Sequence, residues 1–260
     1  HKEYRRQRQM CIRDRAKCQH KKRAKARFLL LIMKTGILIF NEIDQLDCTG
    51  PFEVLSRVPE MTIEFIGYSK EPVRDMKGLQ LLPTLTYQDV SSLDILVIPG
   101  GYGQYALMSH EPTIQFLQTI CPTTKFLMTV CTGTLLAGVA GLLEGYKATT
   151  HWTSHHLLKY LGITPIKERY VVDRNVVSTA GVTGGIDGAL ILASLVSSPE
   201  VAQQIQLYME YDPRPPFDAG YPTKASKPVL DTVTKNAKPI TDKREEACKN
   251  FAKLRGLPCD

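Results

Sequence analysis

The chain has 260 residues, of which 43% are hydrophobic and 23% are charged. These are the proportions of an ordinary globular protein, and they exclude a disordered chain, a collagen-like repeat and a coiled coil. The purely apolar runs, such as residues 28–33, are far shorter than the roughly 20 residues that span a bilayer. We therefore expect no membrane partner.

The net charge of +7 is unevenly distributed along the chain. Residues 1–32 carry 12 Lys and Arg against 2 acidic residues, and residues 223–260 carry 9 against 5. Residues 33–222 carry 12 against 19, so the middle of the chain is acidic. Because a protein that binds nucleic acid needs its positive charge on the folded body, we expect no nucleic-acid partner.

The seven cysteines, at positions 11, 18, 48, 121, 131, 248 and 259, are scattered and form no CxxC pair. Their spacing indicates neither a zinc site nor a disulfide framework. We therefore expect reduced thiols and a cytoplasmic protein.

These patterns divide the chain into three parts. We expect residues 1–32 to be a disordered extension foreign to the fold; an organellar transit peptide is the alternative, since Arg is frequent there and acidic residues are rare. Residues 33–222 form the predicted catalytic domain, which opens directly into a strand at MKTGILIF. Residues 223–260 show an irregular amphipathic pattern, which predicts one or two helices packed on the domain or on a partner subunit.

Between residues 34 and 197, short apolar runs alternate with helical stretches. Strands are predicted at residues 36–40, 61–68, 95–98, 125–130 and 176–178, and helices at residues 50–56, 111–120, 132–140 and 186–196. This alternation implies right-handed crossovers and a mostly parallel sheet, so we predict a three-layer α/β sandwich. The glycines of GGYG lack the spacing of a dinucleotide fingerprint, and no nucleotide cofactor is implied.

Three features fall at the carboxyl ends of predicted strands, where such sheets bind ligands: Asp47, the Pro99-Gly100-Gly101 turn and Cys131. Cys131 joins the strand KFLMTV directly to a helix, which forces it into a sharp turn that projects the thiol over the sheet edge. The helix N-terminus favours negative charge, so we expect a lowered pKa for this thiol. The alternative is an inert buried cysteine.

Four segments carry a family resemblance: VCTGTLLAGVAGLLEGYKATTHW, VIPGGYG, QLDCTGPFEVL and LYMEYDPRPPFDAGYP. They resemble the ThiJ/PfpI superfamily, with its glutamine amidotransferase-like (flavodoxin-like) fold, and within it most closely the isocyanide hydratases. The similarity runs from about Lys34 to Pro222. The CTG elbow and ATTHW also occur in sensor domains of AraC-type regulators, whereas QLDxTGP together with PPFxAG is more specific.

This resemblance implies that Cys131 is a nucleophile with Asp47 as its carboxylate partner, in a homodimer that uses neither a metal nor a redox cofactor. The chemistry is sensible, because a thiolate can attack the electrophilic carbon of an isocyanide and a neutral Asp47 can protonate that carbon. Addition of water to the thioimidate then releases an N-substituted formamide and the free thiol. Without the resemblance, Asp47 could equally be a helix cap or turn carboxylate.

The remaining candidate residues surround this pair. The backbone N–H of Thr132, and those of Gly100 and Gly101, are candidates to meet developing negative charge. In the hydratases the AGVTGG turn also lines the pocket, which makes Val182 and Thr183 candidates for substrate binding. The alternatives are a helix-start threonine, turn glycines and an ordinary strand-to-helix turn.

Three further features could have a special role, but a structural role is expected for each. His151 and His155 have the spacing of a metal pair, but no third ligand is suggested, so core or surface histidines are expected. Cys48, beside Asp47, is expected to be an inert small residue, and Trp152 a core or subunit-contact anchor.

Thr132 also separates this chain from part of the superfamily, because several members have His directly after the nucleophile. That difference disfavours protease, glyoxalase and deglycase activity. The rival from another class is a non-catalytic sensor, which would bind a ligand or respond to peroxide through Cys131.

Overall fold

The computed structural model describes residues 32–257, so the extension predicted at residues 1–32 lies outside the described residues except for its last position. The chain from Lys34 onward forms one compact unit. No helix in residues 32–257 is long and apolar enough to cross a membrane.

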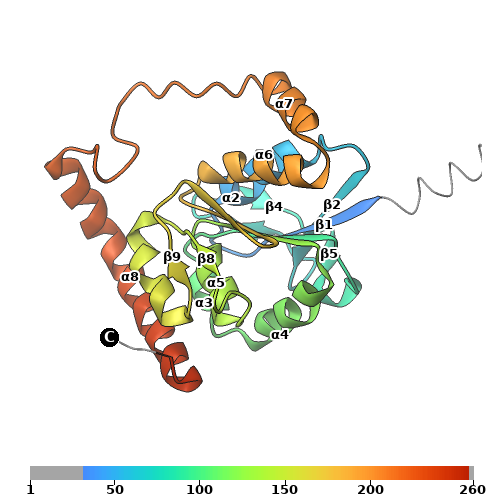
Figure 1. Cartoon of the computed structure of the whole chain (residues 1–260). Coiled ribbons are helices and arrows are strands. Elements are labelled where there is room, and N and C mark those ends of the chain that lie inside the picture. Colours follow the sequence, from blue (N-terminus) through green and yellow to red (C-terminus); the bar gives the residue numbers. More distant parts are fainter. Residues whose placement is uncertain (1–31, 258–260) are drawn as a thin grey trace, which may run out of the picture. The chain divides into compact units, whose positions relative to one another are not determined.

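A seven-stranded sheet in the order β10-β11-β7-β6-β1-β2-β5 forms the centre of this unit (Figure 1). Its strands are β1 (Met33–Leu38), β2 (Met61–Gly67), β5 (Leu85–Thr86), β6 (Ile95–Ile98), β7 (Phe126–Val130), β10 (Tyr170–Asp173) and β11 (Val176–Thr179). The pairs β1–β6, β6–β7, β7–β11 and β2–β5 are parallel, and β10–β11 is antiparallel. The predicted mostly parallel α/β fold is confirmed.

Helices cover both faces of the sheet, which is why its middle strand, β6, is apolar and buried throughout (Figure 1). One face carries α2 (Gln45–Leu55) and α6 (Gly184–Val196), with α7 (Pro199–Tyr208) packed on α6. The other carries α3 (Gln104–Leu107), α4 (Glu111–Ile120) and α5 (Gly133–Val139). The shorter elements are η1 (Tyr87–Asp89), η2 (Cys121–Thr123), η3 (Trp152–Leu161) and the two-stranded pairs β3 (Val73–Arg74) with β4 (Gln80–Leu81) and β8 (Lys147–Ala148) with β9 (Thr164–Pro165).

Helix α2 begins at Gln45, five residues earlier than the helix predicted at residues 50–56. Gly50 and Pro51 are helix-breaking residues, so the pattern wrongly placed the start at them. In the structure Gly50 faces α6, and an added Cβ would lie 3.2 Å from the side chain of Ile186. Close packing of the two helices therefore favours a glycine inside α2, and Asp47 lies in its first turn rather than at the cap.

The C-terminal tail forms a single helix, α8 (Lys227–Arg255), which continues through Pro239. It packs against η3, α3 and α5 of the same chain. Its buried residues, Arg244, Cys248 and Ala252, all lie after Pro239. They are spaced four residues apart and therefore share one face of the helix. Between α7 and α8 the chain runs as a long, mostly exposed segment (Figure 1).

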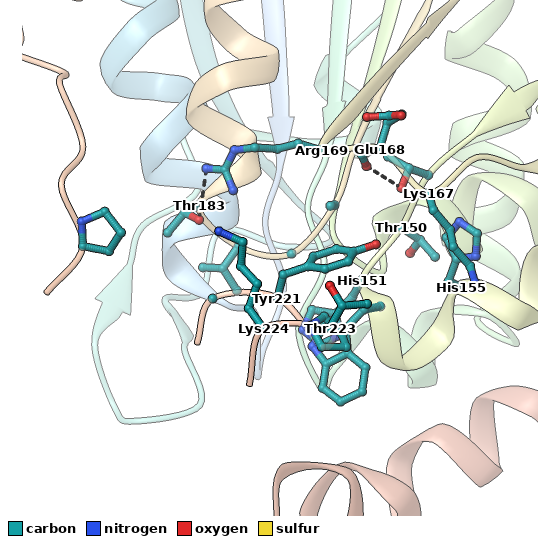
Figure 2. A pocket seen from close by; sticks show the side chains of 18 of the residues that line it. Thr150, His151, His155, Lys167, Glu168, Arg169, Thr183, Tyr221, Thr223 and Lys224 are labelled. Carbon is teal, nitrogen blue, oxygen red and sulfur yellow. Dashed lines mark hydrogen bonds between the residues drawn. The ribbon is translucent and has the colours of Figure 1, made fainter. Parts of the chain in front are cut away.

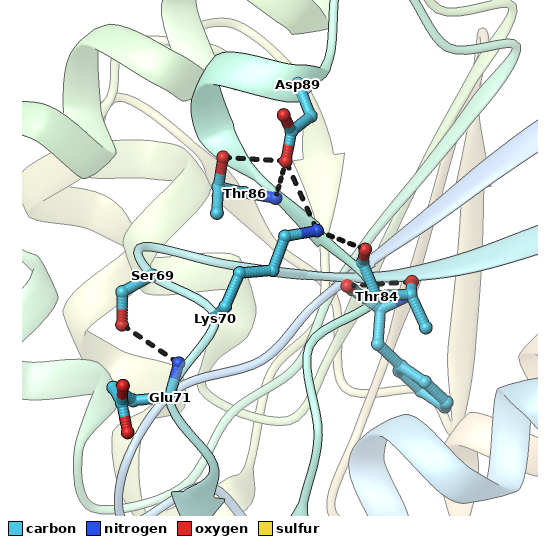
Figure 3. A network of polar contacts seen from close by, with 7 residues as sticks. Ser69, Lys70, Glu71, Thr84, Thr86 and Asp89 are labelled. Carbon is cyan, nitrogen blue, oxygen red and sulfur yellow. Dashed lines mark hydrogen bonds and ion pairs between the residues drawn. The ribbon is translucent and has the colours of Figure 1, made fainter.

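Polar contacts hold the edge of the sheet at β5 (Figure 3). Lys70 donates to the backbone oxygen of Thr84 and forms an ion pair of 3.3 Å with Asp89. Asp89 in turn accepts from the backbone N–H and hydroxyl of Thr86, at 2.8 and 2.9 Å. These contacts lie around the short edge strand, so we assign them a structural role.

Candidate active site

Cys131 occupies the sharp turn between β7 and α5, as predicted. Its φ angle is 54°, a left-handed conformation that is uncommon for a residue with a side chain and costs strain energy. The residue is only 6% exposed. A nucleophile held at such an elbow projects over the sheet edge at the start of the following helix.

Two neighbouring segments, around Thr150 and at residues 180–182, hold this turn. The Cys131 N–H donates to the carbonyl of Ala180 at 3.0 Å, and the Thr150 hydroxyl donates to the carbonyl of Cys131 at 2.6 Å. The backbone N–H groups of Val182 and Thr132 act on the sulfur and lower the pKa of the thiol. The AGVTGG turn is brought here because β11, which precedes it, pairs with β7.

Asp47 lies fully buried beside this thiol. Burial, followed by the negative charge of Asp44, raises the pKa of its carboxyl to about 8, against the opposing effects of the Gly100 N–H and the Cys131 thiol. The Gly100 N–H donates to Oδ2 at 2.9 Å, whereas Oδ1 makes no regular hydrogen bond within residues 32–257. The carboxyl is therefore neutral at pH 7, with Oδ1 the better position for its proton.

The Pro99-Gly100-Gly101 turn lies against both Asp47 and Thr132. A Cβ on Gly100 would lie 2.6 Å from the Thr132 nitrogen and 2.9 Å from Asp47 Oδ2, so only glycine fits. Gly101 has a φ of +127°, and its N–H donates to Thr132 Oγ1 at 3.3 Å. Both N–H groups thus hold side chains of the site, rather than being free to meet the charge of a substrate.

The expected lowering of the Cys131 pKa is wrong. Burial, and then the charge of Asp47, raise the pKa of this thiol well above its usual range. The N–H groups of Val182 and Thr132 and the charge of Arg244 act in the opposite direction and are outweighed. The N–H groups around the elbow do lower the pKa of the thiol, as expected. The sequence does not show how deeply the elbow is buried, and burial has the larger effect on the pKa.

A cavity of about 700 Å³ adjoins the AGVTGG turn (Figure 2). Val182 and Thr183 line it, with His151 and Trp152 at the start of η3 and residues 215–224 of the exposed segment. In Figure 2, Tyr221 and Lys224 lie near Arg169, which donates to the Thr183 hydroxyl at 3.3 Å. Cys131 is not among the lining residues, but two of its neighbours are: Val182, whose N–H acts on the sulfur, and Thr150, whose hydroxyl donates to the Cys131 carbonyl.

Arg244 is the residue of this region that the sequence did not indicate. It comes from α8 and is 4% exposed, and its guanidinium donates to the carbonyl of Gly101 at 2.6 Å and to Gln104 Oε1 at 3.1 Å. The irregular amphipathic pattern of the tail predicted a helix, but it gave no sign of a buried charge.

His151 and Cys48, for which structural roles are expected, make local contacts. Burial, and then the charge of Arg244, lower the pKa of His151 to about 4, and Thr153 is its hydrogen-bond partner at 2.8 Å. Cys48 is buried and donates to the Gln45 carbonyl at 3.1 Å. No group of three or more His, Cys, Asp or Glu within residues 32–257 is placed to hold a metal ion.

Residues 33–194 match the family model described as the DJ-1/PfpI family. The chain belongs to the DJ-1/PfpI family. This confirms the ThiJ/PfpI resemblance of the motifs. A curated relative, the isonitrile hydratase of Pseudomonas putida, is 41% identical over 222 residues, which cover 85% of this chain and 97% of the relative.

Solved structures agree with this DJ-1/PfpI assignment. A ThiJ/PfpI family protein from Pseudomonas syringae superimposes with a TM-score of 0.81 at 32% identity, covering 83% of this chain and 90% of that one. Schizosaccharomyces pombe DJ-1 superimposes with a TM-score of 0.60 at 20% identity, covering 70% of this chain and 100% of that one, and supports the fold alone.

Proposed function

We propose that this DJ-1/PfpI protein is an isocyanide hydratase, a lyase that adds water to an isocyanide to give an N-substituted formamide. The observation that carries the proposal is a neutral, buried carboxyl, Asp47, beside the thiol of a nucleophile elbow, Cys131. The isonitrile hydratase relative supports the same reaction, since isonitrile is another name for isocyanide.

The reactive form of the site keeps one proton between Asp47 and Cys131. Because both groups have raised pKa values, the pair releases its first proton near pH 8 and retains the second at much higher pH. Because the pKa of Cys131 is the higher of the two, the remaining proton lies mainly on the sulfur. The amides of Val182 and Thr132 stabilise the less populated arrangement, with the negative charge on sulfur and the proton on Asp47, and this arrangement reacts.

In this form the Cys131 sulfur attacks the terminal carbon of R–N≡C. Asp47 delivers its proton to that carbon, so the sum of the step is addition of the thiol S–H across the carbon. The product is the thioimidate R–N=CH–S–Cys131. A linear isocyanide suits a buried cysteine, only 6% exposed as a residue, because the reacting carbon of the isocyanide carries no other substituent.

Water then adds to the thioimidate carbon to give R–NH–CH(OH)–S–Cys131. Breaking of the C–S bond, with return of a proton to the sulfur and Asp47 pair, releases R–NH–CHO and restores the starting thiol. Each atom of the substrate and the water is found in the formamide, and no electrons are gained or lost. The protein residues named here supply the nucleophile and the proton.

The substituent R is assigned to the 700 Å³ cavity, where Val182 and Thr183 line the side nearest the sulfur. Thr132, Gly100 and Gly101 hold the reacting pair in place through their hydrogen bonds. We further propose a cytoplasmic homodimer, in keeping with the family resemblance and with a cysteine pattern that suggests no disulfide framework.

The test is turnover of phenyl isocyanide, followed by the absorbance of the formamide, with the wild type and Cys131→Ala measured side by side. We expect rapid formation of N-phenylformamide by the wild type and none above background by the folded variant. Persistent turnover by Cys131→Ala would remove this residue from the reaction. A folded wild type without turnover, whose Cys131 reacts with peroxide, would instead favour the sensor.

A further inference from the structure

Arg244 and Asp47 are the only buried acidic or basic side chains within residues 32–257, with histidines set apart. Both lie at the elbow of Cys131, although Asp47 comes from α2 and Arg244 from the far C-terminal helix. A buried charge is costly unless a partner of opposite charge or several hydrogen bonds compensate it. The position of Arg244 close to the Cys131 thiol therefore needs an explanation.

Arg244 first acts as a clamp on the glycine turn. Its Nη2 donates to the carbonyl of Gly101 at 2.6 Å, while the Gly101 N–H donates to Thr132 Oγ1. The N–H of the preceding residue, Gly100, donates to Asp47 Oδ2. The guanidinium thus fixes the one segment that connects both neighbours of the sulfur. Its Nε bond to Gln104 holds the plane of the guanidinium in that orientation.

No carboxylate pairs with Arg244 in the described part of the chain, whereas five of the six other arginines there form an ion pair with one. The groups that face its charge are Cys131 first, and then Tyr102 and, on its own helix, Cys248. The charge favours the anionic form of Cys131 and disfavours the cationic form of His151. Asp47 is the other charged group that acts on Cys131.

We propose that Arg244 is a positioning residue for Cys131: it clamps the Gly100-Gly101 turn against the elbow and supplies the buried positive charge that the anionic sulfur needs. This inference rests on the nucleophilic role given to Cys131 in the proposed function. It makes the C-terminal helix part of the active site.

The test measures the rate of Cys131 alkylation by iodoacetamide as a function of pH, in full-length protein, by mass spectrometry of the peptide that carries Cys131. Arg244→Met removes the charge and keeps an unbranched side chain, and Arg244→Lys keeps the charge without the planar fork. Lys243→Met removes an exposed charge from the neighbouring position of the same helix and is the matched control.

We expect Arg244→Met to raise the apparent pKa of alkylation by about 1 to 3 pH units, the size of effect of a nearby opposite charge. Arg244→Lys and Lys243→Met should leave it within a few tenths of a unit of the wild type. An unchanged apparent pKa in folded Arg244→Met would overturn the proposal, because a purely structural role predicts that result.

Arg244→Lys keeps the test decisive if Arg244→Met does not fold. A raised apparent pKa in Arg244→Lys would contradict the role of the charge, whereas a wild-type value combined with slower turnover would support the clamp and the charge together. Alkylation does not require isocyanide hydration. Failure of the proposed function would therefore appear as missing turnover, with the alkylation result unaffected.

Discussion

Two buried cysteines neighbour Asp47, Cys48 in the sequence and Cys131 in the fold. They differ in what surrounds the sulfur. Cys48 follows Asp47 in α2, and Cys131 lies at the β7–α5 elbow. In both, burial is the largest cause of a raised pKa and the charge of Asp47 is the second. Cys48, with a pKa raised to about 12, contacts its own helix, through the Gln45 carbonyl and the amides of Cys48 and Thr49.

The pKa of Cys131 is instead affected by groups from three distant segments. Val182 comes from the turn after β11, Asp47 from α2 and Arg244 from α8. Burial and a neighbouring carboxyl are therefore common to an inert thiol and to a proposed nucleophile. Donors and a positive charge that converge from other elements distinguish the second thiol.

The largest expected difference is in turnover. Cys131→Ala should lower kcat for phenyl isocyanide by about 10,000-fold or more, because the nucleophile is lost. Cys48→Ala should stay within about two-fold of the wild type, since it removes one local contact of a buried small residue. Steady-state kinetics on both folded variants check this. Equal losses of kcat in the two variants would contradict the distinction between the two thiols.

Asp47→Asn should lower kcat by about 100- to 10,000-fold, because the amide cannot deliver a proton to the isocyanide carbon. Alkylation of Cys131 should persist in this variant, and at a lower pH, since a charge that raises the pKa of the thiol is gone. Kinetics and alkylation on the same preparation measure both effects. Near-normal turnover would assign Asp47 a structural role.

The same substitution should change how stability depends on pH. The pKa of Asp47 is about 8 when folded and about 4 when unfolded, so unfolding releases a proton between these values. The free energy of unfolding contributed by this group therefore falls as the pH rises from 4 to 8, by about 1.4 kcal/mol per unit at most. Asp47→Asn should gain stability over the wild type by a few kcal/mol between pH 5 and pH 8, as measured by urea denaturation. Parallel stability curves would contradict the raised pKa.

The smallest effect is expected at Asp44, whose charge is the second cause of the raised pKa of Asp47. Asp44→Asn should lower the midpoint of Asp47 ionisation from about 8 by a fraction of a unit to about one unit. The carboxyl ¹³C shift of Asp47, assigned with Asp47→Asn, reports this midpoint. Asp231→Asn, on the exposed part of α8, serves as the control, and an unchanged midpoint in Asp44→Asn would exclude Asp44 as a cause.

Local patterns were enough to predict the elbow and five of the seven strands of the sheet, but not the edge strands β5 and β10. A strand that runs directly into a helix places Cys131, and the glycine turn after another strand places Gly100 at the same edge of the sheet. Local patterns were misleading at Gly50 and Pro51, where packing of α2 on α6 overrides helix propensity. They were also insufficient for the pKa of Cys131, since the depth of burial depends on the whole fold.

Arg244 was out of reach of such patterns for a different reason. Its neighbours in α8 are mostly exposed and charged, so a single arginine among them resembles any surface residue. Only the packing of the face that carries Arg244, Cys248 and Ala252 shows that this side chain points inward. Long-range contacts of this kind leave no periodic signal in the sequence.

The family model ends at residue 194, and Arg244 lies beyond it, on the part of α8 that follows Pro239. The residues proposed as nucleophile and acid lie inside the matched segment, whereas the proposed source of positive charge lies outside it. On this proposal the acidity of the thiol depends on a helix that contributes no reacting atom. Substitutions confined to α8 would then change the reactivity of Cys131 without altering a residue of the elbow.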